Sequence, residues 1–168
     1  MTQPRSPDGA ASRADGPACL LRHAVSADLP RLVDLEQRCF NSDRLSRRSW
    51  SRLIRSPSAL VTVAIERDDQ MLGAAVVLFR STSAVARVYS IAVDAAARGR
   101  GIGRHVMHRC MLDAESRGCA IVRLETRADN QAAQHLYRGL GFEPLDRKPD
   151  YYEDGQAAWR FEHRLRAS

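Results

Sequence analysis

The sequence lacks the long apolar segments of membrane and secreted proteins. Its longest apolar run, Gly73 to Phe79, is far shorter than the roughly 20 residues that a membrane-spanning helix needs. A signal peptide needs an apolar stretch of about 7–15 residues near the start, and only Leu20 and Leu21 stand together there. We therefore expect a soluble, cytoplasmic protein without a membrane partner.

Cysteine is scarce, and the four thiols show no C-x-x-C spacing. A chain of 168 residues can bury a core without a disulfide scaffold, so we expect reduced thiols. His105 and His108 are three residues apart but lack the carboxylate and the third ligand of a zinc motif. No metal site is expected, and the two histidines are expected to be solvated. The cysteines are Cys19, Cys39, Cys110 and Cys119.

Lysine is almost absent, since Lys148 is the only one among 26 basic residues. The net charge is +6, but the arginines are scattered among 20 acidic residues and form no block of like charge. This distribution indicates compositional bias and does not favour a nucleic-acid partner. A basic nucleic-acid-binding module without catalytic turnover stays open as a remote alternative.

The first seventeen residues have a composition different from that of the rest. They are rich in Pro, Ser, Gly, Asp and Ala and show no periodic apolar pattern, which predicts a disordered tail over residues 1–17. Residues 18–168 are long enough for one domain and too short for two. The oligomeric state stays open between a monomer and a homodimer.

The apolar pattern of this domain alternates between strand and helix periods, which predicts an α/β fold with a mixed sheet. A Ser26 cap, the segment Ser46–Arg55, the amphipathic segment Ile102–Arg117 and an Asn130 cap indicate four helices. The expected strands are Leu20–His23, Leu60–Glu66, Leu72–Phe79, Val85–Val93, Cys119–Thr126, Phe142–Asp146 and Ala157–Leu165.

A glycine-rich turn, Arg98 to Arg104, joins the third of the apolar runs after Pro57 to a helix. Unpaired amides and the helix dipole make such a junction an anion site, although a solvated loop is also compatible with the composition. Two phosphate motifs fail on spacing. The dinucleotide fingerprint would need glycine at Arg104, and a P-loop would need a lysine, but Lys148 lies far downstream.

The pattern that remains, Arg98-x-x-Gly101-x-Gly103 after an apolar strand, resembles the acetyl-CoA motif of GNAT N-acetyltransferases. The order of elements from Leu20 to Leu165 is also that of this superfamily. The resemblance implies a GNAT fold, with a mixed central sheet of about seven strands and four helices, and an acyltransferase that uses acetyl-CoA. Strand amides would pair with the pantetheine arm and turn amides would hold the pyrophosphate. The residues implied are Ile91, Ala92, Val93, Arg98, Gly99, Arg100, Gly101, Ile102, Gly103 and Arg104.

Within the superfamily, the second half of the chain looks like the bacterial ribosomal-protein alanine N-acetyltransferases. The segments that carry this likeness are Leu124–Asn130, Leu136–Phe142 and Tyr151–Gly155. The first half, which shapes the acceptor site in this superfamily, matches less clearly. The resemblance implies a protein or peptide α-amine as acceptor, and a small amine or a lysine side chain stays open as the alternative.

Glu125 lies near the carboxyl end of its expected strand, where ligands bind in α/β sheets. Alternation places it on one face with Ile121 and Arg123. By the resemblance it is the general base, whereas the residues alone also allow an ordinary carboxylate beside Arg123. A modest base suits an α-amine, because its reference pKa is near 7.7–8.0 and that of lysine is near 10.4.

Tyr137 follows Ala133 and Leu136 at helical spacing, so a core aromatic is one reading of it. The resemblance implies instead that its hydroxyl faces the thioester sulfur and hydrogen-bonds the departing thiolate. A backbone N–H near Val93 is expected to stabilise the oxyanion. Asn130 is expected to cap its helix, to contact coenzyme A, or to do both.

Tyr151 and Tyr152 are adjacent in a chain with only 6% aromatic residues. They stand in a loop before the last strand, which suits the wall of an acceptor-peptide site. Packing beneath the loop is the alternative.

Overall fold

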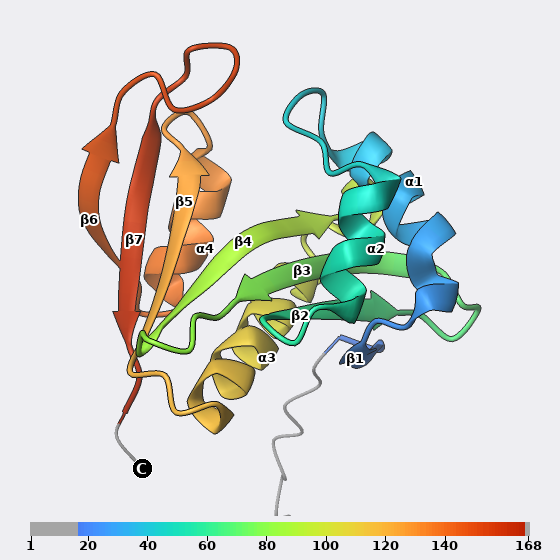
Figure 1. Cartoon of the computed structure of the whole chain (residues 1–168). Coiled ribbons are helices and arrows are strands. Elements are labelled where there is room, and N and C mark those ends of the chain that lie inside the picture. Colours follow the sequence, from blue (N-terminus) through green and yellow to red (C-terminus); the bar gives the residue numbers. More distant parts are fainter. Residues whose placement is uncertain (1–16, 167–168) are drawn as a thin grey trace, which may run out of the picture.

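The structure, a computed structural model, describes residues 17–166. It is an α/β domain built on one seven-stranded mixed sheet in the order β1-β2-β3-β4-β5-β7-β6 (Figure 1). The expected fold class is confirmed, but the expected tail lies outside the described residues apart from Pro17. No helix in the described part of the chain has both the length and the apolarity to cross a bilayer.

The elements follow the predicted order closely. The strands are β1 (Leu20–His23), β2 (Ala59–Ile65), β3 (Met71–Leu78), β4 (Val85–Val93), β5 (Ile121–Arg127), β6 (Glu143–Lys148) and β7 (Ala158–Arg164). The helices are α1 (Leu29–Cys39), α2 (Arg47–Arg55), α3 (Ile102–Ser116) and α4 (Gln131–Gly139), with short 3-10 turns at Ser26–Asp28 and Ala95–Ala97.

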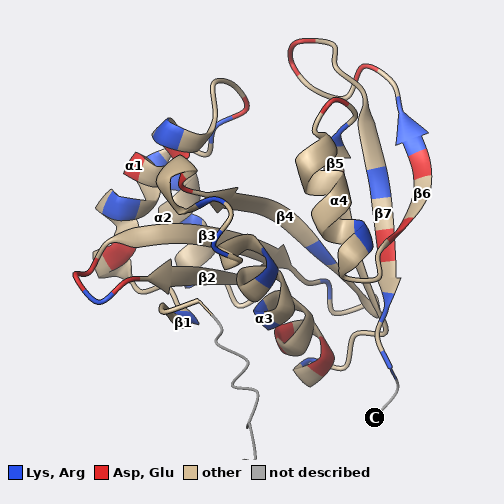
Figure 2. Cartoon of the chain, turned by 180° about the vertical axis from the view of Figure 1, so that it is seen from behind, with Lys and Arg blue, Asp and Glu red and all other residues tan. Residues whose placement is uncertain are grey.

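Two apolar clusters cover the two faces of the sheet. On one face, Leu32 of α1 and Trp50 of α2 pack with Val63 of β2. On the other, Met107 of α3 and Tyr137 of α4 belong to the cluster that includes Phe161 of β7. Among the strands, α1 and α2 pack on β2 to β4, so the corresponding face of β5, β7 and β6 can carry charged side chains; Figure 2 shows charged residues along β6 and β7.

The first helix starts differently from the prediction, because Ser26 is not its N-cap. Ser26 begins a 3-10 turn, and α1 follows from Leu29. The buried carboxylate of Asp28 accepts the N–H of Val25 at 2.8 Å and two hydrogen bonds from Arg22 at 2.7 and 2.8 Å. Asp28 stands at the N-cap position of α1 without a side-chain cap hydrogen bond, and its carboxylate bonds back to Val25, the residue before the 3-10 turn.

β4 and β5 pair for only four residues and then separate, as Figure 1 shows. The parallel pairs run from Val85 with Ile121 to Val88 with Leu124. Beyond them β4 continues to Val93 while paired only with β3, and Tyr89 forms a bulge where the register shifts. The sheet is thus open between the carboxyl half of β4 and that of β5.

Candidate active site

The glycine-rich turn follows β4 and leads into α3. Gly99 and Gly101 both have φ of +77°, a left-handed conformation that glycine adopts without a steric penalty. A Cβ at either glycine would meet no atom within 4 Å, so the backbone faces open space. The first helical hydrogen bond of α3 is from His105 N–H to Gly101 O, at 3.0 Å. The amides of Ile102, Gly103 and Arg104 precede it, have no acceptor among residues 17–166, and can bind an anion.

Gly103 has a different role, which is close packing. A Cβ there would lie 3.3 Å from Leu136 Cδ2 and 3.5 Å from Val93 Cγ2. The absence of a side chain lets the first turn of α3 approach both α4 and the end of β4. The free amides of the turn are therefore held near the edge of β4.

The arginines around the turn are arranged unequally. Arg98, Arg100 and Arg104 are all exposed, but Arg100 pairs with Glu66, and Arg104 Nη2 lies 3.5 Å from Gly139 O. A groove of about 400 Å³ lies beside the start of α3. Its lining includes Arg100, Gly101, Arg104, His105, His108 and Leu140. The two histidines that we expected to be merely solvated thus border this groove.

The carboxyl half of β4 has one free edge. Ile91, Ala92 and Val93 pair with β3 on one side, and within residues 17–166 no strand pairs with them on the other. The Val93 carbonyl accepts a weak hydrogen bond from the Cys39 thiol at 3.4 Å. A free strand edge offers backbone amides and carbonyls to an extended ligand.

Glu125 stands on β5 at the open gap, with its side chain 13% exposed. Its Oε2 accepts a hydrogen bond from Arg87 Nε at 3.1 Å. Arg123, which was expected as a possible neighbour, pairs instead with Glu162 at 2.7 Å. Glu125 is thus paired with Arg87 of the neighbouring strand β4, and not with Arg123 of its own strand.

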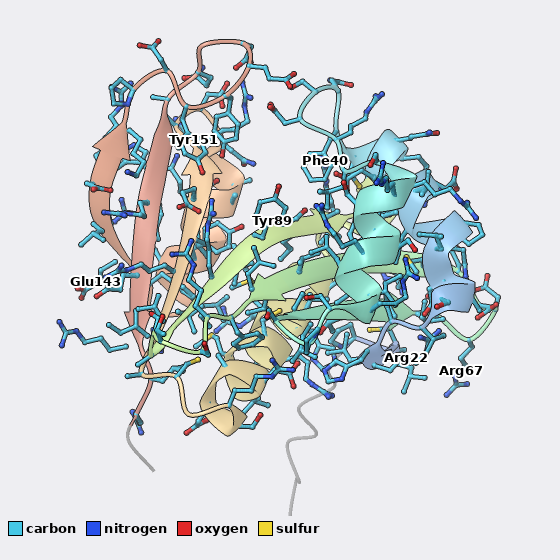
Figure 3. The ribbon with its side chains drawn as sticks, viewed as in Figure 1. Arg22, Phe40, Arg67, Tyr89, Glu143 and Tyr151 are labelled. Carbon is cyan, nitrogen blue, oxygen red and sulfur yellow. The ribbon has the colours of Figure 1, made fainter. Side chains whose placement is uncertain are left out.

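Tyr151 joins the same group of side chains. Its hydroxyl accepts a hydrogen bond from Arg87 Nη2 at 3.0 Å, and its ring stands edge-on to that of Tyr152, with centroids 5.0 Å apart. Figure 3 shows Tyr151 and Tyr89 at the two sides of the gap between β5 and β4. Burial, and the nearby Tyr151, raise the pKa of Tyr152 to about 12, so this phenol stays protonated at neutral pH.

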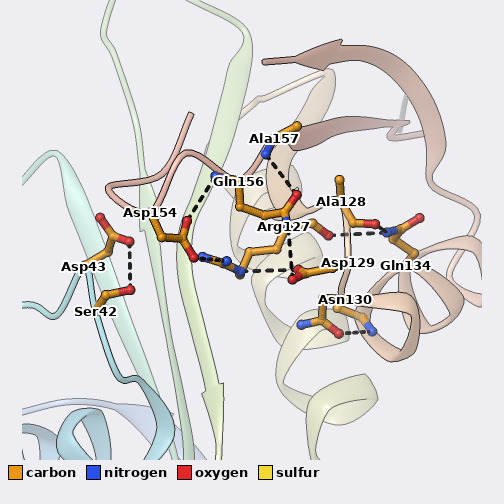
Figure 4. A network of polar contacts seen from close by, with 11 residues as sticks. Ser42, Asp43, Arg127, Ala128, Asp129, Asn130, Gln134, Asp154, Gln156 and Ala157 are labelled. Carbon is orange, nitrogen blue, oxygen red and sulfur yellow. Dashed lines mark hydrogen bonds and ion pairs between the residues drawn. The ribbon is translucent and has the colours of Figure 1, made fainter. Parts of the chain in front are cut away.

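Polar contacts anchor the loop that carries the two tyrosines to the end of β5 (Figure 4). Arg127 pairs with Asp129 and Asp154, and Gln156 Nε2 donates to Asp129 Oδ2 at 3.2 Å. The Arg127 guanidinium also lies 4.9 Å from the centroid of the Tyr152 ring. The aromatic pair is therefore held in a fixed place beside the gap.

Tyr137 and Asn130, both on or next to α4, show their structural roles plainly. Asn130 Oδ1 caps α4 by accepting the N–H of Ala133 at 3.0 Å. Tyr137 is 4% exposed and packs against Phe142 and Phe161, with ring centroids 6.0 and 6.1 Å away. Burial raises its pKa. Tyr137 lies on the face of the sheet that α3 and α4 cover, whereas Glu125 and Tyr151 lie on the opposite side.

Arg87 was missed by the sequence analysis, although it connects two of the expected site residues. The one available signal was an arginine within the apolar segment Val85–Val88. Its role depends on the pairing of Arg87 with Arg123 across β4 and β5, which places Arg87 two residues from the level of Glu125, on the same face of the sheet. A sequence pattern does not contain this register.

Comparison with known proteins agrees with this geometry. The model of the acetyltransferase (GNAT) family matches residues 29–142. The [ribosomal protein bS18]-alanine N-acetyltransferase of Salmonella typhimurium is 30% identical over 134 residues, which are 78% of this chain and 85% of that enzyme. An uncharacterised protein of Mycobacterium leprae is 31% identical over 88% of this chain, but the chain spans only 41% of that protein.

The fold has close counterparts among solved structures. The crystal structure of the ribosomal-protein-S18-alanine N-acetyltransferase of Escherichia coli superposes with a TM-score of 0.79 at 25% sequence identity. The superposition covers 89% of this chain and 96% of that one.

Proposed function

Because the chain belongs to the GNAT acetyltransferase family, we propose that it transfers the acetyl group of acetyl-CoA to the N-terminal α-amine of a protein or peptide. Its enzyme class is that of the family, the acyltransferases. The observation that carries the proposal is the gap between β4 and β5, which has the glycine-rich turn beyond the end of β4 and Glu125 on its β5 side. The names of the Salmonella and Escherichia coli relatives, both alanine N-acetyltransferases, support the α-amine as acceptor.

The turn and the strand edge fit acetyl-CoA as substrate. The open backbone of residues 99–104 suits a pyrophosphate, because amides at a helix N-terminus bind anions. The free edge of Ile91–Val93 suits the amide groups of the pantetheine arm. The thioester would then lie in the gap, where a fixed backbone N–H of Val93 is available to the carbonyl oxygen that becomes an oxyanion.

Glu125 is proposed as the general base. Its Oε2 is bonded to Arg87, and Oε1 has no hydrogen-bond partner among residues 17–166. This oxygen can take a proton from the acceptor ammonium, directly or through water, and leave the neutral amine that attacks the acetyl carbon. Deprotonating a lysine would cost about 3.4 kcal/mol more than deprotonating an α-amine, since their reference pKa values differ by roughly 2.5 units.

Tyr137 is proposed to hydrogen-bond the thiolate that leaves when the carbon–sulfur bond breaks. Its hydroxyl has no protein partner among the described residues, and the packed rings around it fix its direction. Burial raises its pKa, so the phenol donates a hydrogen bond and keeps its proton. The attacking nitrogen loses a second proton as the amide forms. The thiolate takes this proton or the one held at Glu125, and the remaining proton goes to the medium.

The test uses acetyl-CoA with two peptides of one sequence that begins with Ala and contains one internal lysine. One peptide has a free α-amine, and the other has an acetylated N-terminus. We expect release of coenzyme A thiol and a mass gain of one acetyl group only with the free α-amine. Equal transfer to the blocked peptide, or transfer to small amines alone, would instead establish the lysine or small-amine alternative.

A further inference from the structure

Arg87 is the one charged side chain of β4, and it lies where β4 and β5 separate. It stands in the third of the four residue pairs that join these strands. Its side chain is 41% exposed and contacts both Glu125 on β5 and Tyr151 in the loop between β6 and β7. Arg87 thus connects three segments around the proposed acceptor site.

Several hydrogen-bond donors of Arg87 remain open. A guanidinium has five N–H groups. Nε donates to Glu125, and one N–H of Nη2 donates to Tyr151. Among residues 17–166 the other donors have no hydrogen-bond partner, and the ring of the exposed Tyr89 lies 5.6 Å from the guanidinium carbon. A planar fork of free N–H groups matches the geometry of a carboxylate.

Arg87 and Glu125 neutralise each other, because neighbouring charged side chains are already paired. On the same face, Arg123 pairs with Glu162 and Arg160 with Asp146, each at 2.7 Å. An acceptor ammonium at Glu125 would add a positive charge without a partner, which is unfavourable in a half-buried site. An acidic side chain on the acceptor would balance this charge, and a basic one would add to it.

From these contacts we infer that Arg87 determines acceptor specificity by binding an acidic side chain directly after the N-terminal residue. The inference rests on the proposed function. Arg87 and Glu125 touch each other, so groups that they bind must be neighbours on the acceptor. The α-amine and the side chain of the next residue meet this condition.

The test compares three acceptor peptides that differ only in the second residue, which is Glu, Gln or Arg. We expect the kcat/KM of the protein to be about tenfold higher for the Glu peptide than for the Arg peptide, which corresponds to one charge-assisted contact. In Arg87→Gln the ratio should fall to about twofold, chiefly through a higher KM for the Glu peptide.

Arg123→Gln is the matched control. Arg123 is the register partner of Arg87 and is ion-paired like it, but its carboxylate is Glu162. This variant should keep the tenfold ratio of the protein itself. Thermal melting and acetyl-CoA binding check that each variant folds. If Arg87→Gln does not fold, Arg87→Lys takes its place, with an expected ratio of about threefold because the charge stays and the fork is lost.

Equal kcat/KM values for the three peptides, or an unchanged ratio in the Arg87 variant, would overturn the inference and leave the proposed function standing. Absence of transfer to every peptide would overturn the proposed function and the inference together.

Discussion

Among single residues, Glu125 bears most directly on the chemistry, because it is a carboxylate at the gap and one of its oxygens has no hydrogen-bond partner in the described part of the chain. We expect Glu125→Gln to lower kcat by about 10²–10⁴-fold, the usual contribution of a general base, and to leave acetyl-CoA affinity unchanged. Thiol release and calorimetry measure the two quantities. Glu162→Gln, which removes a carboxylate from the same face, is the control and should keep kcat within about twofold.

A substitution at Tyr137 can distinguish a catalytic role of its hydroxyl from a packing role of its ring. The change Tyr137→Phe keeps the ring against Phe142 and Phe161 and removes only a hydroxyl without a protein partner among the described residues. We expect the free energy of unfolding to change by less than about 1 kcal/mol and kcat to fall by about a hundredfold. Denaturant unfolding and thiol release measure these. Full activity in a stable variant would show that Tyr137 only fills the core.

Glu125 and Arg87 also show what the sequence could and could not predict. Glu125 was found because its strand, its face and its place near the strand end follow from local pattern. The neighbour named for it was Arg123, since neighbours on one strand are all that alternation reveals. Arg87 reaches Glu125 only because four residues of β4 and β5 pair in one register. This register joins segments far apart in the sequence, and neither segment alone predicts it.

Among the elements, α3 and its glycine-rich turn offer an internal comparison. Gly101 at the start of α3 and Gly118 just beyond its end both have φ of +77° and open space at Cβ. Alanine at either should destabilise the fold by about 1–2 kcal/mol, because a Cβ is strained in this conformation. Only Gly101→Ala also places a methyl group beside the proposed pyrophosphate.

We therefore expect Gly101→Ala to weaken acetyl-CoA binding by about tenfold, equal to about 1.4 kcal/mol, and Gly118→Ala to leave it unchanged. Calorimetry gives the affinities, and denaturant unfolding gives the stabilities. A similar loss of affinity in both variants would mean that strain alone is responsible and that the turn does not contact the substrate.

The start of α4 tests the two roles expected of Asn130. Its Oδ1 caps the helix, so Asn130→Ala should lower the free energy of unfolding by about 1 kcal/mol. Asn130→Asp restores a capping oxygen and should recover that stability. If both variants bind acetyl-CoA as the protein does, capping is the whole role; a weaker affinity in both would add a contact with coenzyme A.

Element boundaries were predicted well where a local signal sets them. Asn130 caps α4 as expected, and Ser46, the expected first residue of the second helix, is the N-cap of α2, since cap and helix lie in one short segment. The start of α1 was wrong because the buried carboxylate of Asp28 pairs with Arg22 of β1 and Arg31 of α1. Tertiary pairing of this kind overrides a plausible cap.

In the whole molecule, two parts of the sheet are hydrogen-bonded to each other only through the short pairing of β4 with β5. β1 to β4 form an antiparallel unit, and β5, β7 and β6 form another; four parallel residue pairs and the apolar cluster that includes α3 and α4 join them. A ligand lying along the free edge of β4 would supply hydrogen bonds that the sheet lacks there. Ligand binding and the integrity of the sheet should therefore be coupled.

This coupling predicts a local pattern of amide hydrogen exchange. At an acetyl-CoA concentration 100 times its Kd, the native state gains about 2.7 kcal/mol. We expect exchange to slow most in segments 91–93 and 98–104, because a bound substrate covers their amides. The outer edge of β6 is the control, since it is equally unpaired in the described chain but lies two strands from the gap. Slowing that is uniform over β6 and the turn would indicate global stabilisation without binding at the strand edge, and slowing confined to β6 would place the ligand elsewhere.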